Sequence, residues 1–124
     1  MAKIPPDTAV RCSHVLIKHA ESRNPISRRT NKSTAEYSLA DAEAEMDKWI
    51  ASLKKDERPL PEKFAALAAH RSDCGSFALG GDLGWFGTGE MQSQFEEAAI
   101  TTKIGEVSKP FNSDSGTHIL FRTG

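Results

Sequence analysis

The sequence contains few cysteines and no long apolar run. Its 124 residues include two cysteines, Cys12 and Cys74, which are too few for a disulfide framework. No Cys-x-x-Cys pair and no clustered His and Cys spacing suggests zinc, so we expect no metal and no other cofactor. No apolar stretch approaches the roughly 20 residues needed to cross a bilayer, so we expect no membrane partner. The composition, with 38% hydrophobic and 27% charged residues, is that of an ordinary globular protein.

A strong net charge is also missing. The formal charge of −1 gives the molecule no general attraction for nucleic acid, so we expect no nucleic-acid partner. Between residues 11 and 32, however, six Lys and Arg residues stand against one acid, whereas the rest of the chain holds 10 basic and 16 acidic residues. A local basic patch on an otherwise acidic protein indicates a discrete anionic ligand more than a long polyanion.

The length fits one domain with one hydrophobic core. Residues 1–8 hold two prolines and no apolar segment of signal-peptide length, so we expect an extended tail followed by a domain over residues 9–124. We also expect a cytoplasmic and nuclear location, and a monomer, since one small domain shows no evident self-complementary surface.

The hydrophobic patterns predict an α+β fold. Residues 9–20 alternate and are apolar on both faces, which is typical of a central strand. Ser38, followed by Asp41, resembles a capping box at the start of an amphipathic helix. The order of elements indicates an antiparallel or mixed four-stranded sheet with helices packed around it. The pattern predicts helices at 38–55, 62–72 and 90–102, further strands at 80–87, 105–112 and 116–123, and a long polar loop at 21–34.

Two histidines and a cysteine are candidates for a chemical site. His14 and His118 each lie in a predicted strand among aliphatic neighbours, and two imidazoles can satisfy each other by hydrogen bonding. Periodicity alone does not say whether they face a core or a cleft. Cys74 precedes a glycine-rich turn, which favours exposure at a cleft edge. It could pair with a histidine as a nucleophile, but no oxyanion-hole motif is visible, and a free cysteine is usually a small buried hydrophobe.

Two further groups have both a plain structural interpretation and a functional one. An apolar set, in which Met91 and Phe95 are spaced to share a helix face, is most simply part of the core. A basic set could be a solvated loop or could converge on a phosphate through charge-assisted hydrogen bonds. The apolar set is Leu83, Met91 and Phe95, and the basic set is Lys18, Arg23, Arg28 and Arg29.

Taken together, these segments resemble the parvulin family of peptidyl-prolyl cis/trans isomerases, specifically its phosphoserine/phosphothreonine-proline-directed branch. The segments that carry the resemblance are "RCSHVLIKH", "SRNP", "SDCGS", "GGDLGWFGTGEMQSQFEEA" and "SDSGTHILFRT", within residues 9–124. The resemblance implies a four-stranded, mostly antiparallel sheet surrounded by about four helices in the order βα3βαβ2. It also implies non-covalent isomerisation of phosphoSer-Pro and phosphoThr-Pro bonds, with phosphorylated proteins or peptides as partners.

The resemblance assigns roles to single residues as well. It implies a catalytic group, a pocket for the substrate proline with one residue at its rim, and a basic cluster that reads the phosphate. The catalytic group is His14, Cys74, Ser115 and His118; the proline pocket is Leu83, Met91 and Phe95 with Gln92 at the rim; the phosphate readers are Lys18 and Arg23.

The sequence departs from the branch at one position. A second arginine usually follows the one at Arg23, and here that residue is Asn24, so Arg28 or Arg29 would have to compensate. Members of the branch often carry an N-terminal WW domain; both tryptophans, Trp49 and Trp85, fall within residues 9–124, so we expect a single-domain form.

Other functions stay open at the level of sequence. One is a parvulin with little preference for phosphate, favoured by the absence of the second arginine. Another is a phosphopeptide-binding module with weak catalysis. A redox or cysteine-hydrolase role is the most distant alternative.

Overall fold

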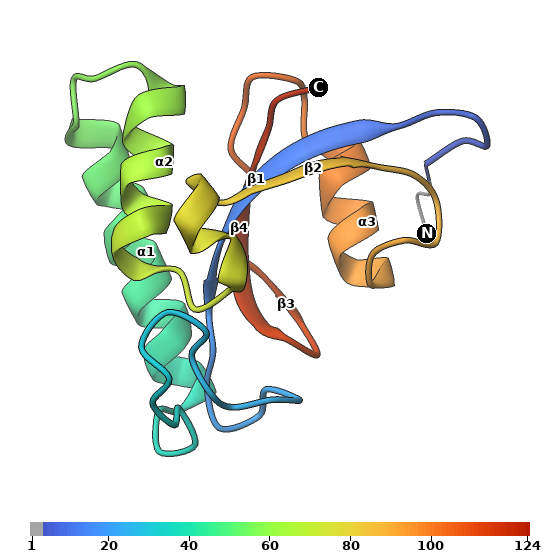
Figure 1. The fold of residues 1–124 in the computed structure, drawn as a ribbon. Helices are drawn as coiled ribbons and strands as arrows, with labels where there is room; N and C mark the ends of the chain where they lie inside the picture. The colour runs from blue at the N-terminus through green and yellow to red at the C-terminus, as the bar shows by residue number, and fades with distance from the viewer. Residues whose placement is uncertain (1–3) are drawn as a thin grey trace.

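The computed structural model describes residues 4–124 and is built on one four-stranded sheet (Figure 1). The strands lie in the order β2-β1-β4-β3, and every pairing is antiparallel. The predicted central strand is confirmed, because β1 pairs with β2 on one side and with β4 on the other. The strands are β1 (Val10–Ile17), β2 (Asp82–Phe86), β3 (Phe111–Ser113) and β4 (Gly116–Arg122).

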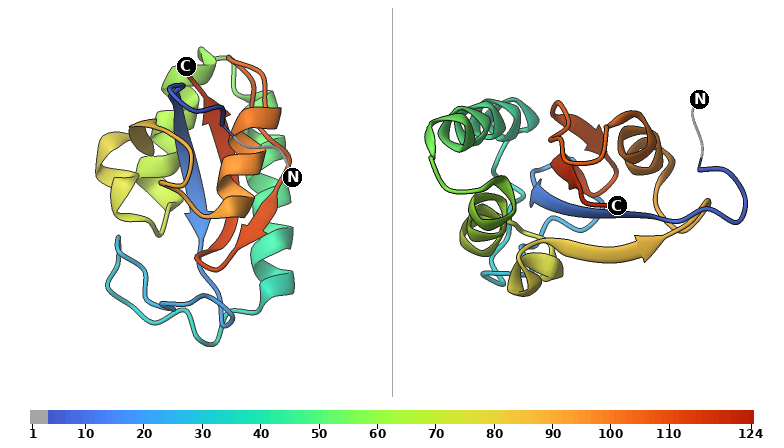
Figure 2. Two further views of the ribbon diagram at one scale, coloured as in Figure 1. Left: turned by 90° about the vertical axis from the view of Figure 1, so that its right-hand side faces the viewer. Right: turned by 90° about the horizontal axis from the view of Figure 1, so that it is seen from above.

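Helices cover both faces of the sheet. Figure 2 shows α1 and α2 on one face and α3 on the other. With the 3-10 helix η1 counted, the observed order is the expected βα3βαβ2. The helices are α1 (Leu39–Lys55), α2 (Leu60–Arg71), η1 (Gly75–Leu79) and α3 (Ser93–Thr101).

The alternation along β1 divides the interior into two clusters. Val15 and Ile17 lie with the buried side chains of α1 and α2, whereas Val10 and Cys12 lie with those around Phe95 of α3. The strand is apolar on both faces, as its sequence predicts, and it packs against a hydrophobic cluster on each face of the sheet. The sheet between them carries the two candidate histidines.

The helix boundaries follow from local chemistry. Ser38 is the N-cap of α1, and its side chain accepts a hydrogen bond from the Asp41 amide at 3.0 Å. Pro61 lies in the first turn of α2, where its missing amide hydrogen has no partner to lose. None of the helices within residues 4–124 is both long enough and apolar enough to span a membrane.

Two predicted boundaries are wrong. The helix expected from residue 90 begins at Ser93, because Gln92 is extended and serves as its N-cap, so Met91 does not share a helix face with Phe95. The strand expected over 105–112 is replaced by β3 at Phe111–Ser113, and Val107 makes only an isolated bridge to Phe121. Pro110 offers no amide hydrogen to a ladder, which is consistent with a strand that starts after it.

Candidate active site

A hydrogen-bonded chain of side chains runs through the centre of the sheet. Nδ1 of His14 on β1 lies 3.2 Å from Nδ1 of His118 on β4. Nε2 of His118 lies 2.6 Å from Oγ of Ser113, at the end of β3. The two imidazoles satisfy each other, as expected, and the serine fixes the outer ring. Burial, and then the charge of His14, hold the pKa of His118 well below its usual value, so this ring stays neutral.

Cys74 lies on the other side of His14 from His118. Nε2 of His14 is buried and makes no well-formed hydrogen bond within residues 4–124, and the thiol is its neighbour. Burial raises the pKa of Cys74, but interactions with His14 and then Ser76 outweigh it and lower the pKa to about 6. The thiolate is therefore favoured at neutral pH.

The cysteine lines a cavity of about 220 Å³ together with cationic side chains. Lys18, Arg23 and Arg28 all lie on this cavity, so three of the four predicted basic residues are brought to the thiol. Ser115 is part of the same lining, as predicted. The cavity is lined by Leu16, Lys18, Arg23, Asn24, Arg28, Cys74, Gly75 and Ser115.

Arg29, the fourth predicted basic residue, points elsewhere. Its Nε donates to the Ser72 carbonyl at 3.3 Å, and its terminal nitrogen lies 4.0 Å from Asp73. It lines a different, polar cavity on the α1 side of the loop. The candidate phosphate site therefore contains Arg28 and not Arg29.

The basic loop, seen at the bottom of Figure 1 between β1 and α1, is fastened to the residue before the cysteine. The Asp73 carboxylate accepts hydrogen bonds from the hydroxyl of Ser27 at 2.6 Å and from the amide of Lys18 at 3.0 Å. The Asp73 carbonyl accepts from the amide of Arg28 at 2.9 Å. These hydrogen bonds fix the position of the Arg28 backbone relative to Cys74 and the cavity.

Lys18 is held more rigidly than a surface lysine. Its Nζ donates to the Ile26 carbonyl at 2.8 Å, and the residue is 6% exposed. Burial and then the charge of Arg28 lower the pKa of Lys18. An anion bound between these two cations would relieve their repulsion, because it would offer both a counter-charge.

The predicted proline pocket forms an apolar surface beside this cavity. Leu83, Met91 and Phe95 belong to one hydrophobic cluster. The ring of Phe95 meets the rings of both His14 and His118 edge-on, each at 5.5 Å between centroids. Leu83 and Met91 are partly exposed above the buried Phe95.

Gln92 joins the apolar surface to the cationic cavity. Its side-chain amide donates to Oγ of Ser115 at 3.3 Å. A peptide that places one side chain on the Phe95 surface would therefore pass Gln92 and Ser115 before it reaches Cys74. The family resemblance implies a rim position for Gln92, and this hydrogen bond places its side chain between the two surfaces.

Several contributing residues were missed from the sequence. Phe111 and Ser113 are the two ends of β3, which forms a hairpin with β4. The ring of Phe111 stacks on that of His118 at 4.9 Å between centroids. Asp73, next to the cysteine, fastens the basic loop. The pairing of β3 with β4 decides which residues face His118. The strand predicted over 105–112 had the wrong boundaries, so these contacts could not be predicted. Within residues 4–124, no group of three or more His, Cys, Asp or Glu side chains is arranged to hold a metal ion.

Comparison with known families shows to which family the chain belongs. The profile of the Rotamase family, a PPIC-type PPIase domain, matches residues 14–124. The chain belongs to this family of peptidyl-prolyl isomerases. The PPIC-type match covers the histidines, the cysteine, the basic loop and the apolar surface.

Individual relatives agree with the family match. The chain is 50% identical over 115 residues to the peptidyl-prolyl cis-trans isomerase ESS1 of Saccharomyces cerevisiae, covering 93% of this chain and 65% of the yeast protein. It is 43% identical over 117 residues to the peptidyl-prolyl cis-trans isomerase Pin1 of Digitalis lanata, covering 93% of this chain and 96% of the plant protein. The chain thus spans just under two thirds of the yeast relative and nearly all of the plant one.

Solved structures of the family show the same fold. The solution structure of TbPIN1 superposes with a TM-score of 0.82 at 44% identity, over 95% of this chain and 99% of that one. ESS1 from Candida albicans superposes with a TM-score of 0.86 at 39% identity, over 98% of this chain and 66% of that one. The parvulin fold expected from the sequence is confirmed.

Proposed function

We propose that this PPIC-type isomerase acts on phosphoSer-Pro and phosphoThr-Pro bonds. The observation that supports this most strongly is that Lys18, Arg23 and Arg28 line the same small cavity as Cys74. A phosphate held by these cations would lie one residue before a proline placed on the apolar surface around Phe95. The susceptible bond would then cross the space between the thiol and Ser115.

The chemistry requires no bond to be broken. Rotation about an X-Pro amide has a barrier of about 18–20 kcal/mol, because the C–N bond must lose its partial double-bond character. An enzyme lowers this barrier by binding the twisted amide more tightly than the planar one. The apolar surface would hold the proline ring while the cations hold the phosphate, so that the carbonyl between them is free to turn.

The groups around the carbonyl suit this task. Ser115 can present its hydroxyl to the rotating amide, and the partly buried site strengthens such polar interactions. The Cys74 thiolate acts through charge and shape, since isomerisation needs no nucleophile. The histidine pair lies beside the thiol, and His14 favours the charged form of Cys74.

Asn24 leaves the phosphate site one arginine short of the usual branch pattern, and we propose that Arg28 replaces it. Asn24 and Arg28 both line the cavity, and the Arg28 amide is fixed by Asp73. The site would then bind the phosphate dianion, whose second ionisation lies near pH 6. Peptide affinity should therefore weaken as the pH falls below about 6.

The test is two-dimensional NMR exchange on a phosphoSer-Pro peptide and its unphosphorylated twin with catalytic amounts of the protein. Exchange cross-peaks for the phosphopeptide alone are the expected result. Equal exchange for both peptides would instead select a parvulin without phosphate preference. Perturbed chemical shifts with no exchange would mean a binding module.

We also propose phosphorylated Ser/Thr-Pro proteins as partners, a monomeric state, and a cytoplasmic and nuclear location. The partner proposal follows from the cationic cavity. The other two are carried over from the sequence, and sedimentation analysis and imaging of the tagged chain would check them.

A further inference from the structure

A second cavity lies away from the isomerase site, between the end of α1, the start of α2 and the segment that precedes β3. Its volume is about 440 Å³, and it shares no lining residue with the cavity of Cys74. In Figure 1 these segments lie in the upper part of the molecule, whereas the basic loop lies at the bottom. The isomerase mechanism makes no use of this surface.

The floor of this cavity is apolar. Ile50 of α1, Leu60 of α2, and Val107 and Pro110 of the segment before β3 all line it, and all four are only partly buried. They belong to or adjoin the edge of the cluster beneath α1 and α2. A partly exposed apolar concavity of this size accommodates one or two large side chains from another molecule.

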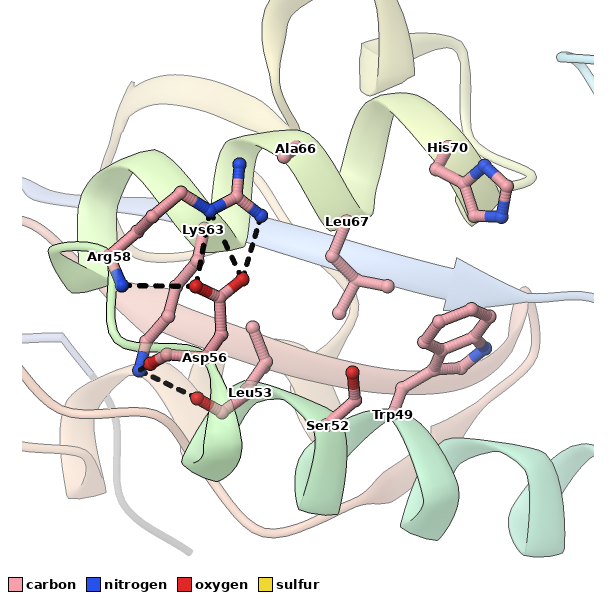
Figure 3. A pocket seen from close by; sticks show the side chains of 9 residues that line it. All are labelled: Trp49, Ser52, Leu53, Asp56, Arg58, Lys63, Ala66, Leu67 and His70. Atoms are coloured by element: carbon pink, nitrogen blue, oxygen red, sulfur yellow. Dashed lines mark hydrogen bonds and ion pairs between the residues drawn. The ribbon is translucent and has the colours of Figure 1, made fainter.

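The walls are fixed before any partner arrives. The amide of Ser108 donates to the Leu120 carbonyl at 2.8 Å, and Oγ of Ser108 accepts from the Leu120 amide at 3.0 Å, so the segment before β3 is clamped to β4. On the opposite side, Nζ of Lys63 donates to the carbonyls of Leu53 and Asp56 at the end of α1 (Figure 3). A partner would meet a preformed groove, which lowers the entropy lost on binding.

The rim of the cavity is cationic. Lys54, Lys63 and Lys109 stand around the apolar floor, and Asp47 is the one acid among the lining residues. Lys54 and Lys109 are exposed, from opposite walls, and make no ion pair within residues 4–124. Charge complementarity therefore selects a ligand that carries carboxylates on either side of an apolar group.

We propose that this groove docks an acidic segment of a partner protein, with one or two large apolar side chains in the cavity and flanking carboxylates on Lys54 and Lys109. An extended peptide fits the observation better than a compact anion, because the two free lysines stand on separate walls with the apolar floor between them. The proposal does not depend on phosphate recognition, since it uses none of the residues of the isomerase site. A client bound here would be kept at high local concentration near that site.

The probe is the hexapeptide acetyl-Glu-Asp-Phe-Leu-Asp-Glu-amide, which contains neither proline nor phosphate and so cannot act as a substrate. It is titrated into the ¹⁵N-labelled protein while the amide shifts are followed. We expect saturable shifts in the amides of Ile50, Lys54 and Val107, and none at Cys74 or Ser115. A peptide with serine in place of phenylalanine and leucine should bind about tenfold more weakly, because it loses the apolar contact.

Charge reversal supplies the matched variants. The double variant Lys54→Glu with Lys109→Glu should weaken the hexapeptide at least about tenfold. The double control Lys48→Glu with Lys55→Glu reverses the same number of charges on α1 outside the cavity and should leave binding nearly unchanged. Dispersed amide spectra and unchanged exchange rates on a proline peptide confirm that both variants are folded.

Three results of the peptide titration would overturn the proposal. They are shifts that do not saturate at millimolar peptide, equal affinity for the serine control, or shifts confined to the cavity of Lys18 and Arg28. If the amides lining the groove moved with protein concentration in the absence of peptide, a second copy of the chain would be the occupant, which also contradicts the proposal.

Discussion

At the scale of single residues, the Cys74 thiol differs from an ordinary cysteine because its pKa is lowered to about 6. Its pKa of about 6 predicts that alkylation by iodoacetamide rises with a midpoint near pH 6, because the thiolate is the reactive form. His14→Asn should move the midpoint upward by at least about one pH unit, since His14 is the main stabiliser of the thiolate. The rate of alkylation, measured by mass spectrometry between pH 5 and about 9, checks both values.

The same lowered pKa affects stability. Because the folded protein holds the thiolate more strongly than the unfolded chain, the resulting stabilisation is fully present above the ordinary cysteine pKa of 9.0 and is lost as the pH falls through about 6. Cys12, which is buried, is the internal control for alkylation. A midpoint for Cys74 near 9 would contradict the thiolate–imidazole pair.

Arg28 and Arg29 are neighbours in sequence with different predicted effects. Arg28→Ala should weaken binding of a phosphoSer-Pro peptide by about tenfold, because it removes one of three cations from the cavity. Arg29→Ala, which removes the same charge from the far side of the loop, should change affinity less than about twofold. Isothermal titration at low and high salt measures both. Equal losses would mean that the loop acts only through its overall charge.

At the scale of elements, β2 approaches β1 so closely that one position admits only glycine. Gly81 has φ +85°, and a Cβ built on it would lie 2.4 Å from the carbonyl oxygen of His14. Gly81→Ala should therefore destabilise the protein by more than about 2 kcal/mol. Gly89 shares a positive φ of +81° in open space, so Gly89→Ala isolates the backbone strain, at about 1 kcal/mol. Chemical denaturation measures the free energy of unfolding of both variants. Similar decreases would show that β1 can shift to make room for the added methyl group.

Much of the element order could be predicted from sequence because it depends on local pattern. The central strand and the start of α1 at Ser38 follow from alternation and capping, and both are observed. The resemblance supplied the roles of Cys74 and the two histidines. Composition and spacing alone left a buried histidine indistinguishable from a catalytic one, because both need a partner.

The failures have a common physical origin. Ser113 and Phe111 touch His118 only because β3 begins after Pro110, and pairing across a hairpin is a long-range choice that local propensity does not contain. The sequence could not show that Arg28 lines the cavity and Arg29 does not. Where each side chain lies depends on hydrogen bonds to Asp73 and Ser72, which are far away in the sequence. These contacts arise from tertiary structure, not from segment pattern.

At the scale of the whole molecule, one polar network joins α1, α2 and the basic loop. Glu45 accepts hydrogen bonds from Tyr37 at 2.6 Å, from Trp49 at 2.8 Å and from Arg71 at 2.5 Å, and Arg71 also donates to Asp73 at 3.1 Å. Burial raises the pKa of Glu45, but the hydrogen bonds of Arg71, Tyr37 and Trp49 lower it to about 2. The helical layer is thereby linked to the residue that fastens the phosphate loop.

Glu45→Gln should lower the free energy of unfolding by about 1–2 kcal/mol at neutral pH, since it removes the charge from these hydrogen bonds. Because the pKa of Glu45 is lowered in the folded state, its contribution is present above the ordinary value of 4.5 and is lost as the pH falls through about 2. The difference between variant and parent should therefore shrink over that range. Glu57→Gln, at an exposed position, is the control in the same denaturation series. A difference independent of pH would contradict the charge-based explanation.

The central position of β1 also has a consequence for biosynthesis. The two histidines that hydrogen-bond across the sheet are separated by 104 residues. During synthesis β1 therefore emerges long before β4, the strand with which it pairs. Vectorial synthesis proceeds at about 5–20 residues per second, which leaves β1 without its β4 neighbour for several seconds. Contacts of such long range also slow the search for the native topology after release. The contact between His14 and His118 can therefore form only after nearly the whole chain has been made.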